Sequence, residues 1–224
     1  MIAERIALSW SGGKDSALAL FKLQSEGKYD VSYFLTTVIR DYGRVSMHGV
    51  REELLREQVM AISGTLDVAY ISKDATNEEY EKVMGEKTQE YYSQGIRRVA
   101  FGDIFLEDIK KYREDRMSRA GMSCLFPLWG EDTAGLARKF IDLGFKALIC
   151  TVDSRMLGKE YAGREFDEDF ISSLPPGVDP CGERGEFHSF VYDGPIFDSP
   201  LRVKRGDVVA RGDFYFSDIL PDKP

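Results

Sequence analysis

Short apolar runs alternate with amphipathic segments along the first two-thirds of the chain. Residues 6–8 and 147–149 are unbroken apolar runs, which is typical of strands covered on both faces. Strands are predicted at residues 5–10, 31–38, 67–71, 97–102, 124–128 and 146–152. Helices are predicted between them, at residues 15–26, 51–63, 77–94, 107–120 and 133–143. This alternation predicts an α/β fold, with βαβ units around a parallel sheet of five or more strands.

The pattern changes after residue 152. Glycine and proline gather between residues 173 and 180, and short β-like pieces follow at 187–192, 201–204 and 213–216. This composition, with its short β-like segments, predicts a smaller, loop-rich α+β lobe after the parallel sheet. The tail, residues 220–224, is expected to be frayed.

Composition narrows the class of protein. The 224 residues are 43% hydrophobic and 12% aromatic, which suffices for a substantial core. Apolar runs stay well below the roughly 18–20 residues of a membrane span, and the first residues do not resemble a secretory signal. We therefore expect a cytoplasmic protein without a membrane partner.

Charge and cysteine content exclude further classes. The net charge of −8 argues against nucleic acid as the main partner, because phosphate-backbone binding needs a basic face. The three scattered cysteines, Cys124, Cys150 and Cys181, predict reduced thiols rather than a disulfide framework or a zinc cluster. A homodimer is compatible with the sequence.

The segment Ser11–Ser16 lies between the first predicted strand and the first predicted helix. Gly12 and Gly13 permit a tight turn in which backbone N–H groups face outward. The helix that follows directs its positive N-terminus to the same place. Two hydroxyls and a cation add donors, so the segment predicts a phosphate-binding loop of Ser11, Gly12, Gly13, Lys14, Asp15 and Ser16.

This loop differs from a Walker A loop, because Leu8 stands where that motif needs its first glycine and Asp15 follows the lysine. An acid at this position is explained if Asp15 orients a Mg²⁺ ion brought by the nucleotide. The alternative is a Gly-Gly turn followed by a helix cap. The complete hexapeptide at the end of a first strand favours the phosphate loop.

Two loop segments add candidate residues. His48 precedes the helix predicted at residue 51 and could contact the nucleotide or the substrate, or could bond only to the backbone at a helix entry. Gly102 and Asp103 end the fourth predicted strand, at the edge where open α/β sheets bind ligands. Asp103 could position Mg²⁺ or a substrate amine, or could cap the next helix. That helix, residues 107–120, is highly charged and is predicted to present a solvated face.

A dense polar cluster occupies residues 182–189. Glu183, Glu186 and His188 are residue types that serve in metal binding or proton transfer. If the segment is extended, Glu186 and His188 share one face and converge on one spot. The alternative is a glycine-rich hairpin with solvated polar residues. The concentration of acids, glycines and a histidine favours a functional site.

The Ser11–Ser16 hexapeptide resembles the pyrophosphatase loop of the N-type ATP pyrophosphatases. This resemblance implies an adenine nucleotide alpha hydrolase-like (HUP, Rossmann-like) domain, which splits ATP into AMP and pyrophosphate. Further segments look like one branch, the diphthine–ammonia ligase family: Gly102–Ile104, Phe126–Trp129, Gly177–Pro180 and Gly182–Glu186. The resemblance implies an ATP-binding domain over residues 1–125 and a substrate lobe over residues 126–224.

The implied chemistry is amidation of an adenylated carboxylate by ammonia, with ATP and Mg²⁺. The carboxylate is diphthine on elongation factor 2 in the family's namesake reaction, or that of a small molecule. The resemblance carries substrate-lobe roles over to Glu183 and Glu186, and the candidate catalytic residues are Lys14, Asp15, Glu183, Glu186 and His188, with Asp15 also at the metal. The other loop residues, with His48, Gly102 and Asp103, are expected to bind the nucleotide.

The chain departs from the family pattern at Arg184 and His188, where the diphthamide-making members have glycine and glutamate. This difference favours another substrate, as in a subgroup suspected of cobalamin salvage. A sulfur-transferring tRNA enzyme would need paired cysteines and a basic surface. A non-catalytic ATP-binding module would not need the second cluster of carboxylates. Because no glutaminase signature is present, free ammonia or a partner protein would supply the nitrogen.

Overall fold

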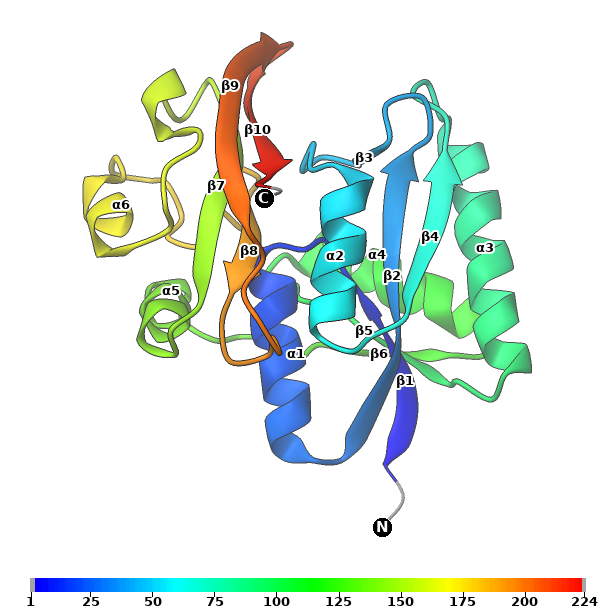
Figure 1. Cartoon of the computed structure of the whole chain (residues 1–224). Helices are drawn as coiled ribbons and strands as arrows, with labels where there is room; N and C mark the ends of the chain where they lie inside the picture. Colours follow the sequence, from blue (N-terminus) through cyan, green and yellow to red (C-terminus); the bar gives the residue numbers. More distant parts are fainter. Residues whose placement is uncertain (1–2, 223–224) are drawn as a thin grey trace.

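The computed structural model describes residues 3–222, and it contains two β-sheets packed against shared helices (Figure 1). In the first sheet, β4 pairs with β2, and the order continues through β1 and β5 to β6, all parallel. A short β3 pairs antiparallel with the end of β2. The strands are β1 (Glu4–Ser9), β2 (Tyr29–Ile39), β3 (Arg44–Val45), β4 (Leu66–Ile71), β5 (Arg98–Ala100) and β6 (Ser123–Leu125).

The second sheet is antiparallel, in the order β8-β7-β10-β9. Its strands are β7 (Lys146–Asp153), β8 (Phe187–Asp193), β9 (Val203–Arg211) and β10 (Phe214–Pro221). The short helices α5 (Thr133–Asp142) and α6 (Glu168–Ser173) and a 3₁₀ turn, η1 (Lys159–Tyr161), lie beside it. The predicted α/β fold with a smaller α+β lobe is therefore confirmed.

Four helices cover the parallel sheet. Buried residues of α1 (Lys14–Glu26) and α2 (Glu52–Ala61) share one core cluster with Ile6 and Leu8 and with the second sheet. Buried residues of α3 (Asn77–Ser93) and α4 (Glu107–Arg119) pack with Ala7 on the other face. Ile6, Ala7 and Leu8 are completely buried, because β1 is covered on both faces. The two lobes therefore share one continuous core around α1.

The predicted elements differ from the structure in several places. The strand predicted at 124–128 ends at Leu125, because Pro127 has no N–H to extend the ladder. The strand at 146–152 has the apolar pattern of the parallel strands, but as β7 it has antiparallel neighbours. The pieces predicted at 201–204 and 213–216 are parts of one long hairpin, β9–β10. Elements β3, η1 and α6 were not predicted.

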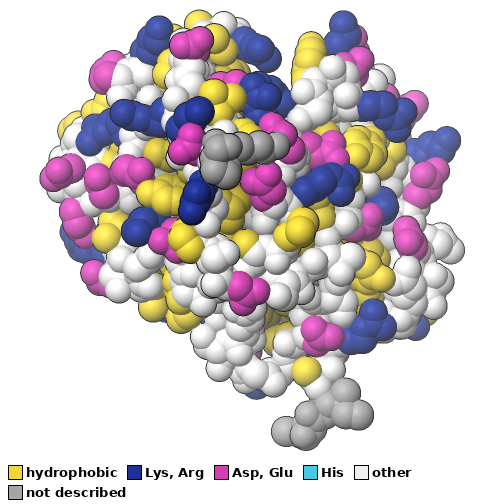
Figure 2. Space-filling view, viewed as in Figure 1, with side chains coloured by type: hydrophobic (Ala, Val, Ile, Leu, Met, Phe, Trp, Pro, Cys, Tyr) yellow, Lys and Arg dark blue, Asp and Glu magenta, His cyan; other side chains and the backbone are white. Residues whose placement is uncertain are grey.

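The expected fraying of the C-terminal tail is wrong for Leu220 and Pro221. Both belong to β10, where they pair with Lys204 and Val203 of β9. Residues 223–224 lie outside the described residues. Within residues 3–222, no helix has the length and apolar character needed to cross a membrane. Figure 2 shows basic and acidic side chains interspersed over the face in view, without a basic stripe.

Candidate functional site

A cavity of about 230 Å³ lies where β1 ends and α1 begins. Its walls come from stretches far apart in the sequence: the loop after β1, the loop before α2, the end of β5, one turn of α4 and the start of β8. We call it the central cavity, and its lining consists of Ser9, Ser11, Gly13, Lys14, Asp15, Ser16, His48, Gly102, Asp103, Arg113, Gly182, Glu183, Phe187, His188 and Ser189. Most of the residues that the sequence singled out are therefore brought together.

The Ser11–Ser16 loop is tied to the second sheet by a buried amide. Gly12 has a left-handed φ of 77°, and a Cβ there would lie 2.7 Å from Leu55 Cδ1, so only glycine fits. The Gln58 side-chain nitrogen donates to Gly12 O (3.0 Å) and to Val191 O (2.6 Å). Trp10 Nε1 donates to Gln58 Oε1 (2.8 Å), and Val191 N donates to Gly12 O (2.9 Å). The loop conformation therefore depends on contacts with β8.

Hydroxyl groups hold the rest of the loop. Gly13 N donates to Ser11 Oγ (3.2 Å), and Ser16 Oγ donates to Gly13 O (2.9 Å). Lys14 N, at the start of α1, donates to Ser189 Oγ (3.1 Å). Gly13 is closely surrounded, because an added Cβ would lie 3.1 Å from a carbon of the His48 ring. The result is a narrow cradle at a helix N-terminus, which fits an anionic group.

The cation of the loop is buried and already paired. The Lys14 side chain is only 3% exposed, and its Nζ lies 2.7 Å and 2.9 Å from the two carboxylate oxygens of Asp15. Burial acts to lower the pKa of Lys14, but Asp15 and other nearby acids together raise it above its ordinary value. Burial also raises the pKa of Asp15, against the opposing effect of Lys14. Lys14 therefore remains charged in the cavity.

Asp15 was expected at a metal ion. Within residues 3–222, no three His, Cys, Asp or Glu side chains are grouped as a metal site. Asp15 faces the cavity with Lys14 as its partner, and it is 30% exposed. Asp15 offers one carboxylate that already pairs with Lys14, so a divalent ion here would need phosphate oxygens of the nucleotide for most of its ligands.

The two histidines of the chain meet in the cavity. The rings of His48 and His188 lie with centroids 4.5 Å apart and planes inclined by 32°. His48 Nδ1 lies 3.4 Å from Ser189 O, whereas His188 Nε2 is buried with no partner among residues 3–222. Burial lowers the pKa of His48 to about 4, and burial, His48 and Lys14 hold the pKa of His188 well below its usual range. Both rings are therefore neutral at neutral pH.

The two glutamates of the 182–189 cluster have different places. Glu183 reaches the cavity, where its Oε1 accepts a hydrogen bond from Ile104 N (2.8 Å), and burial raises its pKa to about 7. Glu186 is 3% exposed, and its carboxylate accepts from Asp179 N and Arg184 N, both at 3.0 Å. Glu186 therefore closes the loop that presents Glu183.

The expected convergence of Glu186 and His188 on one spot is wrong. Strand β8 begins at Phe187, so Glu186 belongs to the preceding turn and the two-residue alternation does not extend to it. Asp179 stabilises the same turn, because its carboxylate accepts from Cys181 N (2.9 Å) and Thr133 Oγ1 (2.7 Å).

Asp103 is paired with a residue that the sequence left in a solvated face. Arg113 of α4 binds both carboxylate oxygens of Asp103, at 2.6 Å and 3.1 Å, and its guanidinium lies 4.4 Å from the centre of the Phe101 ring. The suggested cap role of Asp103 is wrong, because Leu106 occupies the N-cap of α4. Gly102 is closely packed, since a Cβ there would lie 3.0 Å from the Asp15 backbone.

Sequence reasoning missed Arg113 and Gln58, and it gave no role to Ser189 and Phe187 within the 182–189 cluster. Arg113 is one of several basic residues on a charged helix, and Gln58 is one polar residue on an amphipathic helix. Neither position has a local pattern that distinguishes it from its neighbours. Phe187 and Ser189 flank His188 in that cluster, and this position next to His188 was the sequence feature that could have identified them.

Comparison with known proteins gives matches over nearly the whole chain. A family model for the diphthamide synthase N-terminal domain matches residues 4–124, and one for the diphthamide synthase C-terminal domain matches residues 132–219. A Danio rerio protein named diphthine–ammonia ligase is 26% identical over 234 residues, which cover 93% of this chain and 90% of that protein. A Schizosaccharomyces pombe protein of the same name is 26% identical over 220 residues, which cover 89% of this chain but 36% of that protein. A Homo sapiens protein, again of that name, is 27% identical over 148 residues, covering 60% of this chain and 55% of that protein.

Proposed function

This chain belongs to the diphthamide synthase family and is an ATP-dependent ligase, and we propose that it adenylates a substrate carboxylate and amidates it with ammonia. The observation that supports this most directly is the central cavity, where the Ser11–Ser16 cradle, buried Lys14 and Glu183 face one space. The proposed division into an ATP-binding domain (1–125) and a substrate lobe (126–224) follows the two sheets. In this division, the central cavity lies between the ATP-binding domain and the substrate lobe.

The proposed ATP contacts follow from the cradle. Backbone N–H groups of the loop, the hydroxyls of Ser11 and Ser16, and the Lys14 cation would bind the phosphates. His48, Gly102 and Asp103 would line the rest of the nucleotide site. Asp15 is the residue that would hold a Mg²⁺ ion brought with ATP, and such an ion would supply neutralisation of charge on the leaving pyrophosphate.

The proposed reaction balances in two steps. A carboxylate oxygen of the substrate attacks the α-phosphorus of ATP, so an acyl-adenylate forms and pyrophosphate leaves. Ammonia then attacks the acyl carbon, AMP leaves with the electron pair of the broken C–O bond, and the nitrogen loses one proton. We assign the acceptance of that proton to Glu183, because it lines the central cavity and its pKa is raised to about 7. Glu186 acts by positioning Glu183.

The identity of the acceptor substrate is a more specific part of the proposal. The relatives' name indicates diphthine and ammonia. His188 lines the cavity with a neutral imidazole, and its buried Nε2 has no hydrogen-bond partner within residues 3–222, so a polar group of the acceptor would find a partner there. We propose diphthine on elongation factor 2 or a small carboxylate as the acceptor. The family match does not favour tRNA modification or a non-catalytic ATP-binding module.

The test measures the products formed from ATP and ammonium. Purified protein is incubated with Mg²⁺ and either diphthine-bearing elongation factor 2 or a small-metabolite extract. AMP and pyrophosphate are expected with one of the two, and Asp15→Asn should abolish them while the exposed Asp30→Asn should not. Formation of ADP and phosphate, or no turnover with either acceptor, would contradict the adenylation mechanism.

A further inference from the structure

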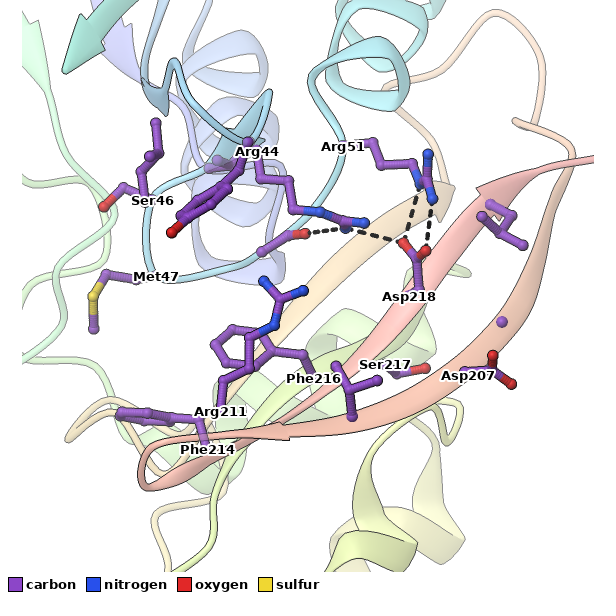
Figure 3. A pocket seen from close by; sticks show the side chains of 17 residues that line it. Arg44, Ser46, Met47, Arg51, Asp207, Arg211, Phe214, Phe216, Ser217 and Asp218 are labelled. Atoms are coloured by element: carbon purple, nitrogen blue, oxygen red, sulfur yellow. Dashed lines mark hydrogen bonds and ion pairs between the residues drawn. The ribbon is translucent and has the colours of Figure 1, made fainter. Parts of the chain in front are cut away.

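A second, larger hollow lies outside the central cavity. We call it the groove; its volume is about 760 Å³, and it lies between the β3 region with the start of α2 on one side and the β9–β10 hairpin on the other (Figure 3). In Figure 2 the surface is notched at its upper edge, between the two lobes. None of the residues singled out in the sequence lines the groove, and its size is that of a small-molecule site, about 300–1,000 Å³.

Apolar side chains form most of the wall, and several remain open to solvent. Tyr42, Met47 and Val209 are 54%, 61% and 41% exposed, and all line the groove. Phe214 and Phe216 of β10 add aromatic rings to the same wall. Exposed apolar surface that is gathered in one concave place is typical of a ligand site, because it is unfavourable in water.

Charged groups in the groove fall into two classes. Asp218 is fully occupied, since it accepts from Arg51 at 2.7 Å and 3.1 Å and from Arg44 at 3.0 Å. Arg211 is exposed, forms no ion pair within residues 3–222, and in Figure 3 extends from β9 into the space between Met47 and Asp218. Asp207 lies at the opposite end of the groove. An anionic group is therefore accommodated at the Arg211 end.

One loop separates the groove from the central cavity. In this dividing loop, residues 46–49, Met47 lines the groove while the next residue, His48, lines the cavity. Met47 has a left-handed φ of 64°, which is strained for a bulky residue, and Thr151 Oγ1 holds the loop by donating to His48 O (2.9 Å). A ligand that contacts Met47 is therefore one residue away from the cavity wall.

We propose that the groove binds the body of the acceptor substrate, a small molecule with a flat, ring-bearing apolar part and an anionic group that Arg211 pairs. This inference rests on the proposed function in assigning the ligand as the acceptor. The ligand class itself follows from the walls: aromatic surface selects a flat apolar body, and the free guanidinium selects an anion. The reacting carboxylate would then have to pass the dividing loop to reach the central cavity.

The test uses 8-anilinonaphthalene-1-sulfonate, a ring-bearing anion whose fluorescence rises on binding, with the full chain. One probe per chain is expected, displaced by 2-naphthoate but not by ATP with Mg²⁺. Arg211→Glu and Met47→Glu should each weaken binding at least about tenfold, because each loses its contact and adds repulsion. The control Arg202→Glu changes an exposed arginine outside the groove and should leave affinity within about twofold.

Equal affinity in all variants, or displacement by ATP, would overturn the groove as the binding site. Concentration-dependent dimerisation that Met47→Glu abolishes would show instead that a second copy covers it. With the acceptor found by the AMP assay, Arg211→Glu should raise the KM of that acceptor about tenfold and leave the KM of ATP unchanged. If the probe binds as expected but no acceptor yields AMP, the ligase proposal fails while the ligand class of the groove stands.

Discussion

The central cavity and the groove share the dividing loop but are built by opposite means. The cavity, about 230 Å³, is lined by backbone groups, hydroxyls, carboxylates and Lys14, whose orientations are fixed by buried hydrogen bonds. The groove, about 760 Å³, is lined mainly by apolar side chains that remain partly exposed, with one unpaired cation within the described chain. The difference means that the cavity is preorganised for charge, whereas the groove, as a ligand site, would select by shape and apolar surface.

The two regions also differ in what supports them. The loop of the cavity is attached to β8 through Gln58, so it depends on packing between the two sheets. The groove depends on the β9–β10 hairpin and on the Arg44–Arg51–Asp218 cluster at its end. A substitution at one site should therefore reduce the function of that site without affecting the other.

Lys14→Ala is expected to produce the largest difference between the two sites, with a loss of AMP formation and no loss of probe binding in the groove. It removes the buried cation from the phosphate cradle and leaves Asp15 without its partner, so AMP formation should fall about 100- to 1,000-fold. The control is Lys22→Ala on the same helix, whose lysine pairs with Glu131 at the surface, and activity there should stay within about twofold. Probe affinity in the groove should be unchanged in both variants. Equal losses in activity and in probe binding would show that the two sites are not independent.

Gln58→Leu should weaken the connection between the sheets. The change keeps the side-chain volume but removes the partners of Trp10 Nε1 and Val191 O in a buried place, at a cost of about 2–4 kcal/mol in the free energy of unfolding. The melting temperature should fall by roughly 5–10 °C. Calorimetry against the exposed Gln24→Leu, expected within about 0.5 kcal/mol of wild type, checks this. Matching stabilities of the two variants would refute the role assigned to Gln58.

A pH titration should distinguish the two sites by charge. Because burial raises the pKa of Glu183 to about 7, this carboxyl is largely neutral at pH 6 and charged at pH 8, when it repels the phosphates across the cavity. ATP affinity should therefore fall about three- to tenfold from pH 6 to pH 8. Both histidines stay neutral in this range, because their pKa values are lowered. Probe affinity in the groove should be constant.

Isothermal titration with the wild type and Glu183→Gln checks this prediction. The variant cannot ionise at that position, so its slope reports only the titration of the nucleotide itself. A slope as steep in Glu183→Gln as in wild type would place the titrating group elsewhere.

Features formed by residues close together in the sequence could be predicted, whereas features formed by contacts between distant elements could not. The cradle was predicted because strand, glycines, lysine and helix start are contiguous, so local rules suffice. Glu183 and His188, which line the cavity, were singled out because polar residues are concentrated around them. Gln58 and Arg113 were missed because their partners, Val191 and Asp103, lie in other elements and are known only from the packing.

The groove was missed because its walls are also formed by elements that are distant in the sequence. Its lining comes from the β3 region and the β9–β10 hairpin, which are far apart in the chain, and apolar residues on strands predict core rather than an open wall. Glu186 shows the opposite error: the alternation rule was applied one residue before the strand begins. The elements of the parallel sheet were therefore predictable to within a few residues, whereas β3, η1, α6, the full β9–β10 hairpin and most contacts between elements were not.

The smallest effect concerns the dividing loop itself. Met47 has a φ of 64°, which glycine adopts freely and a β-branched residue resists, so Met47→Val should cost about 1–2 kcal/mol in unfolding free energy, and Met47→Gly should stay within about 1 kcal/mol of wild type. The control is Met60, which is 75% exposed in helix α2. There the order should reverse, because glycine is the poorer helix former. Urea unfolding of the four variants measures both orders. If valine is tolerated at 47 as well as glycine, the left-handed conformation of Met47 does not store strain in the dividing loop.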